Sequence, residues 1–125
     1  MNMESILLQK KAMSRGLLWL DENVQFLEDL LLQYNFRVKV IPPGTKDEQV
    51  KDLVEGRVFI TANSKDFIDE IDVYLYCLVA VDNAPKDPII LAKAISDAWR
   101  LLHIKGRSEA HIIINANGDA HVERE

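Results

Sequence analysis

The sequence predicts an α/β protein in which helices cover both faces of a mostly parallel central sheet. Two observations predict this class. Short apolar runs typical of buried strands alternate along the chain with segments whose apolar residues recur at helical spacing, and right-handed crossovers between parallel strands place helices on both faces. The 125 residues suit a single domain, residues 1–125, because no repeat or linker divides them.

The first part of the chain predicts two helices around a buried strand. Residues 1–15 are interpreted as a helical lead-in, and the continuous apolar run at 17–20 is typical of a strand buried on both faces. Apolar residues then recur at helical spacing over 24–34. This helix should begin near 21–23, whose polar side chains can cap it, and end at Asn35, which tolerates a left-handed conformation.

The next segment predicts a half-exposed strand followed by a short helix. Residues 36–41 alternate between apolar and mainly basic side chains, and the Pro-Pro-Gly sequence after them forces a turn. Thr45 and Glu48 have the spacing of a capping box, so a helix should start there and end at Gly56.

The second half predicts two more buried strands, a long helix and an antiparallel hairpin at the edge of the sheet. Asn117-Gly118 has the composition of a tight hairpin turn. The expected elements are a strand at 58–61, a short helix or loop at 67–72, a strand at 74–81, a helix from 91 to near Gly106, and hairpin strands at 110–114 and 120–122.

Composition excludes several functional classes. Fifteen basic against twenty acidic residues give a net charge of −5, so binding of a polyanion would need a local patch or bound cations. A single cysteine, Cys77, permits no internal disulfide, which favours a cytoplasmic location. No apolar run has the length of a membrane span, so we expect no membrane partner, and the first residues lack the pattern of a signal peptide.

Polar residues follow two of the predicted parallel strands. Residues 21–23 are Asp-Glu-Asn, and residues 61–66 contain Thr61, Asn63 and Asp66. Ligands of open parallel sheets bind beyond the carboxyl ends of the strands. With the acidic start of the helix near Glu48, three acidic segments could meet there, and carboxylates so close repel one another unless a cation joins them. Oxygen ligands of this kind suit Mg²⁺ or Mn²⁺, as in a metal-dependent phosphodiesterase.

The stretch from 17 to 67 resembles the PIN-like domain superfamily, specifically its small single-domain bacterial and archaeal members. Residues 20–23 read Leu-Asp-Glu-Asn, as at the end of the first strand in that family. An acidic helix start follows at 46–50, and 58–61 read Val-Phe-Ile-Thr before a polar segment that ends in Asp66-Phe67. The resemblance implies a three-layer, Rossmann-like α/β/α fold of the PIN type.

The resemblance also implies a function, a Mg²⁺- or Mn²⁺-dependent endoribonuclease acting on RNA, and a set of site residues. Many such proteins are toxins, so it implies a cognate antitoxin protein as a partner. Asp21 matches the first metal ligand, Glu48 the helix acid with Asp47 as the alternative, and Asp66 the acid before the aromatic residue. Thr61 and Asn63 stand where the family has a hydroxyl and an Asp or Asn. Where many members have Asp the chain has neutral Asn63, which reduces the anionic charge.

Other interpretations of the same residues stay open. Asp21, Glu48 and Asp66 would serve equally well as helix caps, and the chain would then be an inactive PIN-like interaction or regulatory module. A phosphoacceptor domain, which needs an acid such as Asp82 after a central strand and a suitably placed lysine, fits poorly. Cys77 is expected to be an inert buried thiol and the three histidines to be surface residues. A homodimer is a further open alternative.

Overall fold

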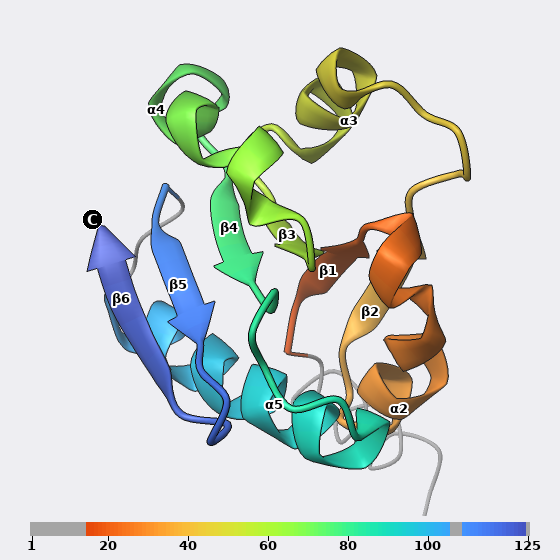
Figure 1. Cartoon of the computed structure of the whole chain (residues 1–125), viewed down its shortest axis with the longest axis vertical. Coiled ribbons are helices and arrows are strands. Elements are labelled where there is room, and N and C mark those ends of the chain that lie inside the picture. The colour runs from red at the N-terminus through yellow and green to blue at the C-terminus, as the bar shows by residue number, and fades with distance from the viewer. Residues whose placement is uncertain (1–14, 106–108, 125) are drawn as a thin grey trace, which may run out of the picture.

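The computed structural model describes residues 15–105 and 109–124, which form alternating strands and helices around one sheet (Figure 1). The strands are β1 (Leu17–Leu20), β2 (Arg37–Val40), β3 (Val58–Thr61), β4 (Cys77–Ala80), β5 (His111–Ile114) and β6 (Ala120–Arg124). The α-helices are α2 (Glu28–Gln33), α3 (Asp47–Val54), α4 (Ile71–Tyr74) and α5 (Pro88–Lys105), and the 3₁₀ helices are η1 (Glu22–Leu27), η2 (Ser64–Asp66) and η3 (Ile68–Glu70).

The six strands lie in the order β2-β1-β3-β4-β5-β6. The first five are parallel and β6 pairs antiparallel with β5. Trp19 is in register with Lys39 on one side and with Phe59 on the other, so β1 lies between β2 and β3. The mostly parallel sheet with a hairpin at its edge is therefore confirmed, and Gly118 forms the expected turn with a φ of 84°.

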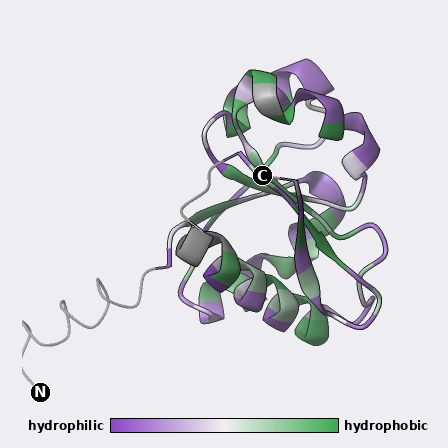
Figure 2. Cartoon of the chain, turned by 90° about the vertical axis from the view of Figure 1, so that its left-hand side faces the viewer, coloured by the Kyte–Doolittle hydropathy of each residue, from purple (hydrophilic) through white to green (hydrophobic). Residues whose placement is uncertain are grey.

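Helices cover both faces of the sheet and give three layers (Figures 1 and 2). Alternate residues of each strand point to opposite faces. Leu18, Leu20 and Ile60 pack in a core with α2 and α5, whereas Phe59 and Leu78 pack in a second core with α3 and α4. The continuous apolar runs of β1 and β3 are explained by this double coverage.

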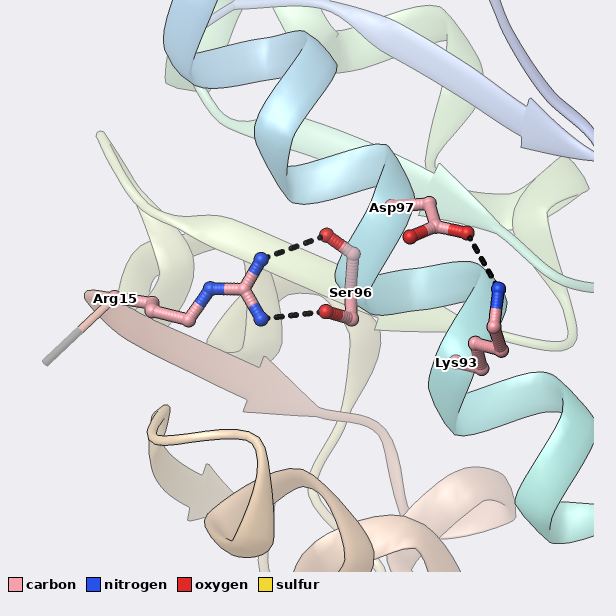
Figure 3. Close-up of polar contacts among 4 residues, drawn as sticks. All are labelled: Arg15, Lys93, Ser96 and Asp97. Atoms are coloured by element: carbon pink, nitrogen blue, oxygen red, sulfur yellow. Dashed lines mark hydrogen bonds and ion pairs between the residues drawn. The ribbon is translucent and has the colours of Figure 1, made fainter. Parts of the chain in front are cut away.

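The entry of the chain into β1 is fixed against α5. The guanidinium of Arg15 donates hydrogen bonds to the hydroxyl and the carbonyl of Ser96, which is 5% exposed (Figure 3). It also lies 4.9 Å from the centre of the Phe36 ring. Lys93 and Asp97 form an exposed pair on the same helix, at 3.4 Å. The Arg15 contacts tie the start of β1 to α5, while the Lys93–Asp97 pair lies within that helix.

Several predicted boundaries hold and others shift. Asn35 follows the α2 helix with a φ of 71°, as expected of a left-handed stop. The predicted strand at 74–81 is too long, because Ile71–Tyr74 form α4 and Leu75 turns the chain with a φ of 56°, so that the strand begins at Cys77. The predicted lead-in helix lies outside the described residues except for Arg15, and Gly106 lies outside them too.

The predicted capping box of α3 is wrong by one residue. The side chain of Gln49 accepts a hydrogen bond from the backbone N–H of Lys46 at 3.4 Å. The Thr45 hydroxyl instead donates to the carbonyl of Pro42 at 2.6 Å, which tightens the turn before the helix. Capping therefore does not account for Glu48.

Candidate functional site

The predicted site residues lie at a topological switch point. In the order β2-β1-β3, the chain leaves β1 towards α2 on one face of the sheet and leaves β3 towards α4 on the other. The two loops therefore separate and leave a crevice at the carboxyl ends of the strands, which is where open α/β sheets bind ligands. Asp21 and Thr61 end these two neighbouring strands, as predicted.

Asp21 is held by both of its carboxylate oxygens. Its Oδ1 accepts a hydrogen bond from the backbone N–H of Glu22 at 2.8 Å, which caps the 3₁₀ helix η1. Its Oδ2 accepts a hydrogen bond from the hydroxyl of Thr61 at 2.7 Å. Because Thr61 is fully buried, this hydroxyl is fixed in position and holds the carboxylate at the edge of the sheet. Asp21 is thus both a cap and a member of the site.

The same chain of hydrogen bonds continues to Asp66. The Oγ1 of Thr61 accepts a hydrogen bond from the backbone N–H of Asn63 at 3.0 Å. The Nδ2 of Asn63 then donates to the Oδ2 of Asp66 at 2.6 Å. Four of the five predicted residues, Asp21, Thr61, Asn63 and Asp66, are joined in this way across 46 positions of sequence. Asn63 is the position at which this sequence differs from many members of the resembled family. Its amide donates the hydrogen bond that holds the carboxylate of Asp66.

Glu48 lies on α3 and not in this hydrogen-bonded chain. Within the described parts of the molecule, no hydrogen bond joins it to the other predicted residues. It lies near the buried ammonium of Lys51, which donates to Glu70 at 2.7 Å. Burial alone would lower the pKa of Lys51, but Glu70, Asp47 and Glu48 raise it above its usual value. The charges of both predicted helix acids are therefore partly balanced by a protein cation.

The donor set fits a hard cation that keeps most of its own waters. Among residues 15–105 and 109–124, no group of three or more His, Cys, Asp or Glu side chains is arranged to hold a metal ion. Asp21 and Asp66 offer carboxylate oxygens, and each oxygen that accepts one hydrogen bond keeps another lone pair. Mg²⁺ is usually bound through one or two carboxylates together with water and substrate phosphates. Two carboxylates match that requirement, while a closed protein cage does not form from the described residues.

Asp82 is a residue of this edge that the sequence analysis did not include among the site residues. It follows β4, and its Oδ2 and Oδ1 accept the backbone N–H of Ser64 at 3.0 and 3.3 Å. This ties the end of β4 to the loop that carries Asn63 and Asp66. The signal was available, because Asp82 follows an apolar run just as Asp21 follows residues 17–20.

Two of the remaining reactive side chains are buried in the sheet. Cys77 is fully buried, and burial raises the pKa of its thiol to about 12, so it stays protonated and inert as predicted. His111 is 6% exposed, which contradicts the expected surface position. It is buried because β5 is an interior strand between β4 and β6. His121, on the edge strand β6, is exposed as predicted and lies 3.1 Å from Glu123.

Comparison with known proteins does not indicate a function for the chain. In the described residues, no helix combines the length and the apolar character needed to cross a membrane. Comparison of the chain with protein-family models, with curated proteins and with solved structures found no match. What the protein does is therefore inferred from its residues and their arrangement.

Proposed function

We propose that the protein is a Mg²⁺- or Mn²⁺-dependent endoribonuclease of the PIN-like type. One observation carries the proposal: a single chain of hydrogen bonds positions two carboxylates, Asp21 and Asp66, at the switch point of a parallel sheet. Supporting it is the order of the motifs at 20–23, 46–50 and 58–67, which is that of the PIN-like superfamily. The toxin role and the antitoxin partner implied by that resemblance are part of the proposal.

Asp21 and Asp66 would hold the cation, and each carboxylate accepts a hydrogen bond from a side chain of β3 or its loop. When bound, the cation would supply a nucleophilic water at neutral pH and stabilise the leaving oxygen of the phosphodiester. The hydroxyl of Thr61 donates a hydrogen bond to Asp21 and accepts one from the backbone N–H of Asn63, so two bonds fix its orientation. Asn63 holds Asp66 through its amide. The two polar side chains of β3 and its loop therefore act as positioning residues.

Electrostatics explain why a cation is needed. The chain has a net charge of −5, and both carboxylates would repel a phosphodiester. A divalent ion between carboxylate and phosphate would reverse this repulsion and make the acidic site compatible with an RNA substrate. Cleavage should therefore depend on added metal.

A second candidate is an inactive PIN-like module that binds a protein partner. The position of Glu48 favours it, because this residue lies near Lys51 rather than in the hydrogen-bonded chain, and the described residues gather fewer than three acids. Without cleavage, Asp21 would serve as the cap of η1 and Asp66 as the acceptor of the hydrogen bond from the Asn63 amide.

The test is cleavage of single-stranded RNA by the purified protein, freed from any bound partner, in Mg²⁺ or Mn²⁺ and again with excess chelator. We expect cleavage with either metal and none with chelator. Protein that is folded by circular dichroism and cleaves no RNA in either metal would contradict the nuclease and leave the interaction module.

Binding of a cation should also raise the thermal stability of the protein. A ligand that binds the folded state stabilises it by RT ln(1 + [L]/Kd), which is about 2.7 kcal/mol at a hundredfold excess over Kd. We expect Mn²⁺ to raise the melting temperature of the wild type and of Asp29→Asn, and to do so much less in Asp21→Asn. Asp29 is an exposed acid of α2 outside the hydrogen-bonded chain, so it controls for loss of charge. Equal shifts in all three proteins would show that the cation binds elsewhere.

A further inference from the structure

A pocket opens beside the hydrogen-bonded chain, at the same carboxyl edge of the sheet. It has a volume of about 140 Å³ and is formed by the segments that follow β1, β3 and β4 together with the start of α5. Asn23 and Ala62, which line it, are sequence neighbours of the site residues, and the backbone N–H of Ala62 donates to Asn23 Oδ1 at 3.2 Å. The pocket and the carboxylates therefore share the two loops of the switch point.

The floor and the rim of the pocket differ in chemistry. Val24, Val81 and Leu91 are each at most 4% exposed and form an apolar floor. The exposed lining residues form the rim: Phe26, Asn23 and Lys86, which bear an aromatic ring, an amide and an ammonium. Phe26 is 53% exposed, so part of its ring lines the pocket while the rest faces solvent. An aromatic ring in this position is a surface on which a second flat ring can stack.

We propose that this pocket binds a single nucleobase, with Phe26 stacking on the base, the Asn23 amide donating to its edge and Lys86 facing the attached phosphate. This inference deepens the proposed ribonuclease and names where one nucleotide of the substrate is held. Bases of single-stranded RNA are recognised by stacking on aromatic side chains and by hydrogen bonds to their edges.

The volume of the pocket and the charge at its rim favour a single nucleotide over a larger ligand. Pockets for drug-sized molecules measure roughly 300–1,000 Å³, so about 140 Å³ accommodates one ring system rather than two adjacent bases. The Oδ1 of Asn23 is already used by Ala62, which leaves its amide nitrogen as a donor towards the ligand. The rim cation suits a phosphate, while the apolar floor suits the face or edge of a base rather than a sugar.

The experiment measures binding separately from cleavage. The full chain is titrated with each of the four ribonucleoside 5′-monophosphates by calorimetry, in the presence and absence of Mn²⁺. We expect saturable binding of at least one of them to the wild type. Phe26→Ala should weaken that binding by about 5- to 150-fold, the range for loss of one base–aromatic stack. Lys86→Met should weaken it less, and by an amount that shrinks as salt is raised.

Matched variants control for nonspecific effects. Leu32→Ala removes an exposed apolar side chain of α2 that does not line the pocket, and Lys93→Met removes an exposed ammonium of α5. Both should bind as the wild type does. Wild type that binds none of the four mononucleotides, or Phe26→Ala that binds as tightly as Leu32→Ala, would overturn the pocket.

The test of the pocket can succeed or fail independently of the test of ribonuclease activity. RNA cleavage with a KM unchanged by Phe26→Ala would retain the nuclease and refute the base pocket. Mononucleotide binding that depends on Phe26, in a protein that cleaves no RNA, would retain the pocket and refute the nuclease.

Discussion

Phe59→Ala should lower the free energy of unfolding by about 3–5 kcal/mol, the range for truncation of a fully buried phenylalanine. Phe59 is completely buried in β3, which pairs with β1 on one side and β4 on the other. Its ring meets that of Phe67 edge-on, with centroids 4.9 Å apart, so the truncation also removes this contact. Because β3 leads directly into Thr61 and Asn63, the loss falls on the strand that carries the site. Urea unfolding followed by circular dichroism measures the change.

Phe26→Ala is the matched control, because it makes the same substitution in a ring that is 53% exposed. We expect it to lower the free energy of unfolding by only about 1–1.5 kcal/mol, since roughly half of the residue is exposed already. Equal losses in the two variants would mean that Phe59 is not in the core beneath α3 and α4. The comparison also establishes that the variant used to test the pocket is folded.

Asp21→Asn and Asp66→Asn should each reduce metal-dependent RNA cleavage by roughly 10²–10⁴-fold, and the double variant should be little worse than either single one. Residues that act as one unit are non-additive, because loss of either ligand displaces the cation. The hydrogen bonds through Thr61 and Asn63 make this expectation sharper, since they join the two carboxylates physically. Single-turnover cleavage rates at saturating Mn²⁺ measure it.

Asp29→Asn again provides the control and should leave the rate unchanged. Effects that multiply in the double variant would show that the two carboxylates work independently, which contradicts a shared cation. Asn63→Asp is the informative reverse change, because it adds charge where many members of the resembled family have it but replaces the amide that donates to Asp66. The loss of that donor predicts lower rather than higher activity, despite the added charge.

The parts of the fold that were predictable from sequence are those that depend on local pattern. Residues 17–20 and 58–60 are apolar without interruption because both faces of those strands are covered, and Asn35 stops α2 through its own backbone preference. The alternation of β2 likewise reflects a strand with one exposed side. These patterns involve residues that are close together in the chain, so they can be recognised in a single sequence.

The remaining features depend on particular hydrogen bonds and contacts that residue type alone does not decide. Thr45 and Lys46 are both acceptable starts for α3, and the turn bond from Thr45 to Pro42 selects the second. His111 has the polarity of a surface residue, yet pairing of β6 buries it. Glu48 lies near Lys51 of its own helix, which forms an ion pair with Glu70. The pairing of β6 and the Lys51–Glu70 ion pair join residues far apart in the sequence, so local spacing does not show them.

The side chains of the two edge strands affect how two copies of the chain could pair edge to edge. β2 and β6 lie at opposite ends of the sheet, and each alternates apolar side chains with exposed polar or charged ones: Arg37 and Lys39 on β2, His121 and Glu123 on β6. An unpaired edge is a template for aggregation, and charged side chains are a common protection. Two copies joined antiparallel along β2 would bring Arg37 and Lys39 of one copy next to those of the other, and like charges so placed repel. A homodimer should therefore not form by pairing of β2 with β2.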